Sequence, residues 1–187
     1  MKTLYLLRHA KSSWADGSLK DFDRPLNARG RRATMLIGAY LRREQIRPDV
    51  VLCSPAIRAR ETLARVGEVM GPDKLPVIHD EALYAASPSV LLDRIRAHGG
   101  DHQAVMLVAH NPGIQELAVG LAGRGKAEAL DRLAGKYPTA GLATIAVDCA
   151  RWSDLKPGDG TLMSFVVPKQ LQRLAPAADR SGVAAAG

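Results

Sequence analysis

The sequence has only two cysteines and no apolar run long enough to cross a membrane. Its two cysteines, Cys53 and Cys149, lie far apart and form no C-x-x-C pair. We therefore expect no disulfide framework and a reducing compartment. The apolar run at the N-terminus stops at Arg8, too early for a signal peptide. Polar residues also interrupt the longer apolar stretches before they could span a bilayer. These absences predict a cytoplasmic protein with no membrane partner.

Motifs for nucleotides and metal ions are missing as well. G-x-x-x-x-G-K-[ST] and G-x-G-x-x-G, whose glycines cradle phosphates, do not occur. His98 and His102 have a zinc-like spacing, but the two glycines between them indicate the exit from a helix, and no third ligand is near in the sequence. We expect no cofactor and no metal site.

Positive charge is concentrated in the first third of the chain. Residues 1–60 hold 13 Lys and Arg against 5 Asp and Glu, whereas residues 61–187 hold 13 against 14. A solvated helix face explains most of this excess, and nothing beyond charge indicates nucleic acid. Docking of an acidic protein partner remains open. The cluster consists of Arg29, Arg31, Arg32, Arg42, Arg43 and Arg47.

Short apolar runs alternate with segments of helical periodicity. They predict strands over residues 3–7, 50–53, 76–79, 104–109, 143–147 and 162–167, and helices over 28–46, 55–70, 88–99, 112–121 and 127–134. Asn27 and three pairs, Ser54-Pro55, Ser87-Pro88 and Asn111-Pro112, are typical of helix starts. The alternation predicts an α/β fold with a mostly parallel central sheet and an antiparallel edge strand.

A length of 187 residues fits one domain. We place it at residues 1–170 and expect residues 171–187, rich in Ala, Pro and Gly, to form a mobile tail. The polar segment at residues 11–25 is a long loop, and loops of this length are usually functional.

Charged side chains follow three of the predicted strands. Arg8 and His9 end the first, Arg58 lies in the opening turn of the helix after the second, and His110 follows the fourth. The carboxyl ends of parallel strands share one edge of a sheet, so we expect these four groups to converge. Arginines, imidazoles and helix N-termini favour a doubly charged tetrahedral anion. We expect no carboxylate among them.

These residues carry a resemblance to a known family. Leu7-Arg8-His9-Ala10, Ser54-Pro55-x-x-Arg58-Ala59 and Ala109-His110-Asn111 resemble the histidine phosphatase superfamily. Arg8-His9-Ala10-Lys11-Ser12, Asp23-Arg24-Pro25-Leu26 and Arg58-Ala59-x-x-Thr62 are similar to its SixA-type phosphohistidine phosphatase branch. The resemblance runs over about residues 1–167 and implies a three-layer αβα sandwich of the phosphoglycerate-mutase-like kind. A mutase is less well matched, because Trp14 is followed by Ala15 rather than by a phosphate-binding Asn.

The resemblance also implies roles. His9 is the expected nucleophile, forming a phosphohistidine intermediate that water hydrolyses, and Arg8, Arg58 and His110 are expected to hold the phosphoryl oxygens, with His110 as an imidazolium. Glu81, or else Asp80, is the candidate general acid. Lys11, Ser12 and Asn111 are candidate substrate-binding residues.

Three functions remain open on these residues. The leading hypothesis is a metal-independent phosphatase that removes phosphoryl groups from protein phosphohistidine, such as a histidine phosphotransfer domain in signal transduction. A phosphohistidine needs little acid catalysis, because its leaving imidazole can depart protonated. The second is a phosphatase for a small phosphate monoester, with Glu81 as its acid. The third is a non-catalytic module that binds phosphorylated proteins through Arg8, Arg58 and His110.

Overall fold

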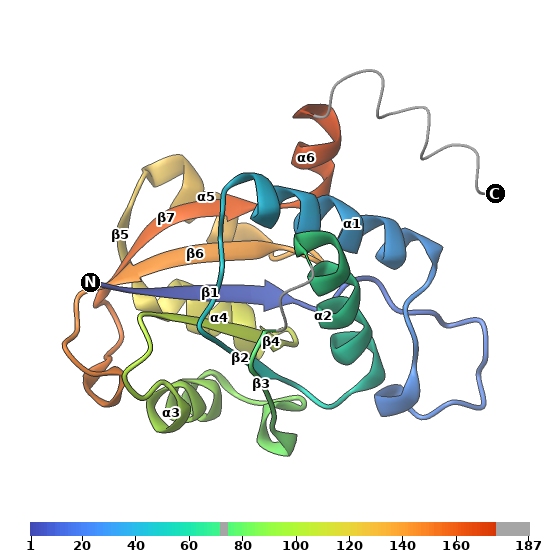
Figure 1. Cartoon of the computed structure of the whole chain (residues 1–187), viewed down its shortest axis with the longest axis horizontal. Coiled ribbons are helices and arrows are strands. Elements are labelled where there is room, and N and C mark those ends of the chain that lie inside the picture. The colour runs from blue at the N-terminus through green and yellow to red at the C-terminus, as the bar shows by residue number, and fades with distance from the viewer. Residues whose placement is uncertain (72–74, 175–187) are drawn as a thin grey trace.

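A seven-stranded sheet in the order β3-β2-β4-β1-β6-β7-β5 forms the middle of the computed structural model, which describes residues 1–71 and 75–174 (Figure 1). All strands but β6 run in the same direction. The strands are β1 (Lys2–Arg8), β2 (Val50–Cys53), β3 (Val77–His79), β4 (Ala104–Ala109), β5 (Ala122–Gly125), β6 (Leu142–Val147) and β7 (Gly160–Val166).

Helices cover both faces of the sheet. On one face lie α1 (Ala28–Arg43), α2 (Ile57–Met70) and α6 (Pro168–Leu174), and on the other lie α3 (Pro88–His98), α4 (Gly113–Leu121) and α5 (Ala127–Gly135) (Figure 1). Successive side chains of a strand point to opposite faces. In β1, Leu4 and Leu6 therefore join one core, and Tyr5 and Leu7 join the other. The predicted α/β fold and three-layer architecture are confirmed.

The antiparallel strand lies inside the sheet rather than at its edge. We expected the last two strands to form an antiparallel edge, but β6 pairs with β1 on one side and with β7 on the other. The edge is β5, which runs parallel to β7 and which the sequence did not predict. Its residues, Ala-Gly-Arg-Gly, have low strand propensity, so only the pairing with β7 makes them a strand.

Helix starts agree with the cap signals at two of four places. The Asn27 side chain caps α1 by accepting from the Gly30 N–H, and Ser87 caps α3 by accepting from the Val90 N–H. The other two predictions are wrong by a few residues: α2 begins at Ile57 after Ala56, and α4 begins at Gly113 after Pro112. The residues freed in this way, Ser54 and Asn111, make contacts in the candidate site instead.

The helix α6 runs past the boundary that we expected at residue 170. Leu171 is buried in the same core as α1 and α2, so residues 171–174 continue the fold. Residues 175–187 of the predicted tail lie outside the described residues. Among the helices that the structure describes, none is both long and apolar enough to cross a membrane.

Candidate active site

Three strand ends place the predicted site residues at one edge of the sheet. His9 follows β1, Ser54 follows β2 and His110 follows β4, and these strands are neighbours in the parallel half of the sheet. The ring centroids of His9 and His110 are 4.9 Å apart. Both rings are buried, with 8% and 5% of the residue exposed. The predicted convergence of the two histidines is therefore found in the structure.

The backbone around His9 fixes the orientation of its ring. Nδ1 of His9 lies 2.8 Å from the carbonyl oxygen of Ala10, a geometry in which Nδ1–H donates. The N–H of Ala10 donates in turn to Oγ1 of Thr62 at 2.9 Å, which ties the β1 end to α2. Burial, opposed by the bond to Ala10 and assisted by the nearby His110, Arg58 and Arg8, lowers the pKa of His9 to about 3. The ring is thus neutral, and its Nε2 carries a free lone pair.

His110 faces the same space with a different partner. Its Nε2 lies 2.7 Å from Oγ of Ser54. Burial, followed by the nearby charge of Arg58, lowers the pKa of His110 to about 4. The ligand-free site therefore holds a neutral His110, and the expected imidazolium, which concerns the site with a phosphoryl group bound, stays a prediction. The ring is neutral because burial and the neighbouring arginines disfavour a second cation.

The backbone of Tyr137 binds the side chain of Arg8. Nη1 of Arg8 donates to the backbone carbonyl of Tyr137 at 2.6 Å. The phenol of Tyr137 is buried and bridges two strands, donating to the Leu6 carbonyl at 2.5 Å and accepting from the Ala143 N–H at 3.1 Å. The loop that carries Tyr137 therefore holds one end of the guanidinium, while Nε of Arg8 makes no hydrogen bond within the described residues.

Arg58 is bound by an acidic residue that the sequence did not single out. Its Nη2 donates to Oδ2 of Asp21 at 2.8 Å, and its Nη1 donates to the backbone carbonyl of Asp21. The hydroxyl of Tyr84 donates to the same Oδ2 at 2.8 Å. Our expectation of no carboxylate among the four predicted groups (Arg8, His9, Arg58 and His110) is therefore wrong, because the long loop at residues 11–25 folds back over α2. Asp21 belongs to the short 3-10 helix η1 (Asp21–Asp23).

Three residues at the candidate site carry buried polar atoms without a described partner. Nε of Arg8, Nδ1 of His110 and Oδ1 of Asn111 are buried, and none has a hydrogen-bond partner within the described part of the chain. A fourth such atom, Oγ1 of Thr144, belongs to β6. Buried polar groups are normally paired, so the three that belong to residues at the carboxyl ends of β1 and β4 favour a ligand there. Two of the three are nitrogen atoms able to donate to an anion. The arrangement suits a tetrahedral oxyanion presented to Nε2 of His9.

Comparison with known proteins agrees with this geometry. The sequence profile of the histidine phosphatase superfamily (branch 1) matches residues 4–85. Rv1276c, an uncharacterised protein of Mycobacterium tuberculosis, is 38% identical over 165 residues, which make up 87% of this chain and 100% of that protein. The chain belongs to the histidine phosphatase superfamily. This membership supports a phosphatase.

Two solved structures of the superfamily resemble this histidine phosphatase over most of its length. One, from Agrobacterium tumefaciens, is provisionally assigned as the phosphohistidine phosphatase SixA; it is 30% identical, covers 89% of this chain and 98% of its own, and has a TM-score of 0.75. The other, from Nakamurella multipartitia, carries the same provisional assignment; it is 30% identical, covers 89% and 96%, and has a TM-score of 0.77.

The remaining predicted residues of this histidine phosphatase are placed less directly at the site. Ser12 is buried, but its hydroxyl accepts from Arg24 at 2.7 Å, and the Lys11 side chain is exposed while its backbone carbonyl binds Asn27. Nδ2 of Asn111 donates to Gln115 at 3.1 Å and, at 3.4 Å, to the same Tyr137 carbonyl that binds Arg8. Of the three, Asn111 alone shares a hydrogen-bond partner with Arg8, His9, Arg58 or His110.

Neither candidate for the general acid is fixed in the site by a contact. Glu81 is an exposed residue of the short 3-10 helix η2 (Glu81–Leu83), and its side chain makes no hydrogen bond or ion pair with any described residue. Asp80 accepts from the Ala82 N–H, and its Oδ2 lies 2.5 Å from Nε of Arg94 and 3.6 Å from Nε2 of His98. Asp80 is thus engaged in an ion pair with Arg94.

Several residues that shape the site were not predicted. The sequence does not single out Asp21, Tyr84 or Tyr137; Ser54 stands there as a predicted helix cap, and Thr62 as part of a motif. The unusual length of the loop at residues 11–25 indicates function, but nothing in its spacing distinguishes Asp21 from Asp16 or Asp23. The contacts of Tyr84 and Tyr137 cross between distant segments, which periodicity does not reveal.

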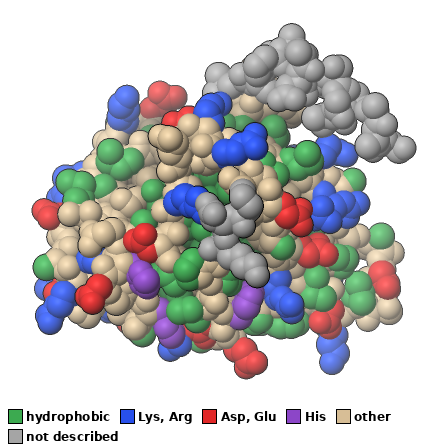
Figure 2. Space-filling model, viewed as in Figure 1, with side chains coloured by type: hydrophobic (Ala, Val, Ile, Leu, Met, Phe, Trp, Pro, Cys, Tyr) green, Lys and Arg blue, Asp and Glu red, His purple; other side chains and the backbone are tan. Residues whose placement is uncertain are grey.

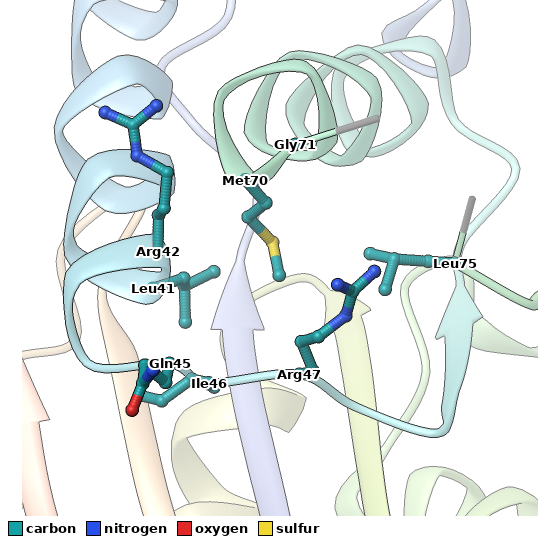
Figure 3. A pocket seen from close by; sticks show the side chains of 8 residues that line it. All are labelled: Leu41, Arg42, Gln45, Ile46, Arg47, Met70, Gly71 and Leu75. Atoms are coloured by element: carbon teal, nitrogen blue, oxygen red, sulfur yellow. The ribbon is translucent and has the colours of Figure 1, made fainter. Parts of the chain in front are cut away.

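The arginines of the basic N-terminal third do not form one patch. Arg29, Arg31 and Arg32 lie at the start of α1, whereas Arg42 and Arg43 lie in its last turn, about 20 Å away. Arg47 follows the helix. On the face seen in Figure 2, basic and acidic side chains are interspersed. Arg42 and Arg47 line a cavity of about 250 Å³ at the C-terminal ends of α1 and α2 (Figure 3). None of the predicted site residues lines this cavity. No group of three or more His, Cys, Asp or Glu suited to a metal ion occurs in residues 1–71 and 75–174.

Proposed function

We propose that this histidine phosphatase removes phosphoryl groups from phosphohistidine side chains of proteins through a covalent intermediate on His9. The observation that carries the proposal is the state of His9: its Nδ1 is engaged by Ala10, its ring is neutral, and its Nε2 makes no hydrogen bond to any described residue. A neutral imidazole with one nitrogen fixed and the other free is an activated nucleophile.

The first step transfers the phosphoryl group to His9. Nε2 of His9 forms a bond to phosphorus while the bond from phosphorus to the leaving nitrogen breaks. Arg8, Arg58 and His110 surround the site and would bind the phosphoryl oxygens, where charge is stabilised in the transition state. A dianion beside His110 favours its protonated form, so we expect His110 to become an imidazolium as the substrate binds.

The second step returns the site to its starting state. Water attacks phosphorus of the intermediate, the bond to Nε2 breaks, and inorganic phosphate leaves with the proton that the water loses. Positive charge comes from the arginines and the imidazole, so the proposed reaction uses no metal ion. Full activity in the presence of a strong chelator is the expected result.

The two candidate general acids bear on the class of substrate. An alkyl phosphate releases a strongly basic alkoxide and needs a positioned proton donor, whereas a phosphohistidine with a protonated ring releases a neutral imidazole. Asp80 is committed to Arg94, and Glu81 is not held by any described residue. Because neither Asp80 nor Glu81 is fixed as an acid by the described residues, phosphohistidine is the favoured substrate. The likeness to structures provisionally assigned as phosphohistidine phosphatase SixA points the same way.

A protein substrate fits the exposed residues beside the site. Trp14 is 74% exposed, and the guanidinium of Arg24 lies 3.1 Å from its ring centroid. Arg24 is bound in turn to Asp21, which binds Arg58. Exposed Trp is typical of protein interfaces, so we place the docking surface for a phosphotransfer domain here. This would make the chain a cytoplasmic component of signal transduction.

Glu81→Gln separates this function from hydrolysis of a small phosphate monoester. We expect the variant to keep the wild-type rate on a histidine phosphotransfer domain carrying phosphohistidine. Glycerol phosphate, which needs an acid, should be a poor substrate for the wild type and the variant alike. Efficient turnover of glycerol phosphate that falls about a hundredfold in Glu81→Gln would instead establish the monoester phosphatase with Glu81 as its acid.

A further inference from the structure

Asp21 lies at the centre of a hydrogen-bonded group that joins three separate segments. Its Oδ2 accepts from Arg58 and from the hydroxyl of Tyr84, each at 2.8 Å, and its Oδ1 accepts from Arg24 at 2.8 Å. Arg58 comes from α2, and Tyr84 follows η2. The carboxylate is therefore held in one place from several sides, as a group that must act at a fixed position requires.

This carboxylate is open to solvent, although the arginine that it binds is not. The side chain of Asp21 is 52% exposed, against 8% for Arg58. Tyr84, which binds Asp21, also packs its ring edge against His110, with ring centroids 5.5 Å apart. Asp21 is thus the solvent-exposed partner of the arginine that would hold the phosphoryl group, and the remainder of a substrate would extend toward this exposed side.

A carboxylate in this position is unusual for a site that binds an anion, because it cancels part of the positive charge. Partial burial of Asp21 is outweighed by the hydrogen bond from Tyr84 and by Arg58, and the pKa of Asp21 is lower than its ordinary value. An ionised carboxylate cannot donate a proton to a leaving alkoxide. It can accept a hydrogen bond from a cationic group.

We propose that Asp21 is a specificity-determining residue that accepts a hydrogen bond from the leaving imidazole of the substrate. This inference rests on the proposed function and names the residue that recognises the leaving group. In a phosphohistidine whose ring is protonated, one nitrogen carries phosphorus and the other carries hydrogen. With the phosphorus facing Nε2 of His9 and the phosphoryl oxygens at Arg58, the distal N–H would reach Asp21, the exposed carboxylate that binds this arginine.

The transfer balances without any further proton donor. The bond between phosphorus and the substrate nitrogen breaks, and its electron pair stays on that nitrogen. The bond between phosphorus and Nε2 of His9 forms. The ring began with a proton on its other nitrogen and leaves as neutral imidazole. Asp21 keeps the substrate's imidazole ring protonated while it is bound, and the protonated ring is a good leaving group. No general acid therefore has to donate a proton to it.

The same charge acts against small phosphate esters. A phosphate monoester presents no cationic ring to Asp21, and a second anionic group on the substrate would meet like charge there. Removing the negative charge should therefore affect the two substrate classes in opposite directions, which a purely structural contribution of Asp21 to the position of Arg58 would not do.

The test is Asp21→Asn, with Asp23→Asn as its matched control. Asp23 lies in the same short helix, and its side chain makes no hydrogen bond or ion pair with any described residue. Each variant loses one negative charge. For each variant, kcat would be measured against pH on two substrates. One is a phosphotransfer domain whose histidine has been phosphorylated with phosphoramidate. The other is p-nitrophenyl phosphate, whose leaving group needs no acid.

We expect Asp21→Asn to lower kcat on phosphohistidine about ten- to a hundredfold near neutral pH, and to move the alkaline fall of kcat to lower pH. Its rate on p-nitrophenyl phosphate should stay the same or rise, and Asp23→Asn should match the wild type on both substrates. Equal losses on both substrates, with an unchanged pH profile, would overturn the inference and leave Asp21 as a support for Arg58. If the wild type itself does not act on phosphohistidine, the proposed function fails first.

Discussion

Ser54 and His110 are joined by a hydrogen bond of 2.7 Å across 56 positions of sequence. The bond engages Nε2 of His110, and Nδ1 of the same ring is buried and without a partner among the described residues. If Oγ–H of Ser54 donates to Nε2, the proton of the neutral ring lies on Nδ1, where it can be donated to an anion. The serine after β2 would thus set the tautomer of the histidine after β4.

Ser54→Ala should therefore weaken anion binding as well as stability. The lost partner leaves Nε2 of His110 buried and unpaired, at a cost of about 1–3 kcal/mol in the free energy of unfolding. We expect vanadate to inhibit the variant at least about tenfold more weakly. Ser87→Ala is the control, because Ser87 caps α3, and its loss costs about 1 kcal/mol of stability. Unchanged vanadate inhibition in Ser54→Ala would contradict this role.

Thr62→Val tests the support of the nucleophile. Thr62 accepts from the Ala10 N–H and donates to the Arg58 carbonyl, so its loss frees the backbone next to His9. We expect kcat to fall about tenfold, since a small displacement of a nucleophile is costly. Thr34→Val is a close match: Thr34 is equally buried and bonds the Arg31 carbonyl one turn back in α1. The control should lose stability and keep its kcat; a parallel loss of activity would refute the assignment.

The pKa values of the site histidines predict a dependence of stability on pH. Histidine in an unfolded chain titrates near 6.5, whereas burial lowers the pKa of His110 to about 4. Between these values the unfolded chain binds more protons, so the free energy of unfolding rises with pH across this window. His110→Gln should flatten the slope by up to about 1.4 kcal/mol per pH unit in urea unfolding. The exposed residue His102, changed to Gln, provides the comparison; equal slopes in both variants would exclude a buried, neutral His110.

Much of the fold could be predicted because β1, β2 and β4 are apolar runs buried on both faces, and the helices between them repeat at helical spacing. The edge strand β5 could not, since its Ala-Gly-Arg-Gly sequence becomes a strand only by pairing with β7. Ser54-Pro55 and Ser87-Pro88 read alike, yet Ser54 binds His110 while Ser87 caps its helix. A local signal cannot show that a distant side chain competes for the same hydroxyl.

The candidate site divides in the same way. Arg8, His9, Arg58 and His110 follow strands or begin a helix, so the rule that carboxyl ends meet at one edge brings them together. Asp21 lies in an irregular loop, and only the folded chain places it against Arg58. The neutral state of His110 could not be predicted either, because it depends on burial and on the distance to two arginines.

The central claim is that His9 carries the phosphoryl group during the reaction, and trapping that intermediate tests it most directly. The protein would be mixed with a radiolabelled phosphodonor and quenched, and the label on the chain would be followed in acid and in alkali. We predict a label that is labile in acid and stable in alkali on the wild type, and none on His9→Ala. Equal labelling of His9→Ala, or normal turnover by that variant, would contradict the account.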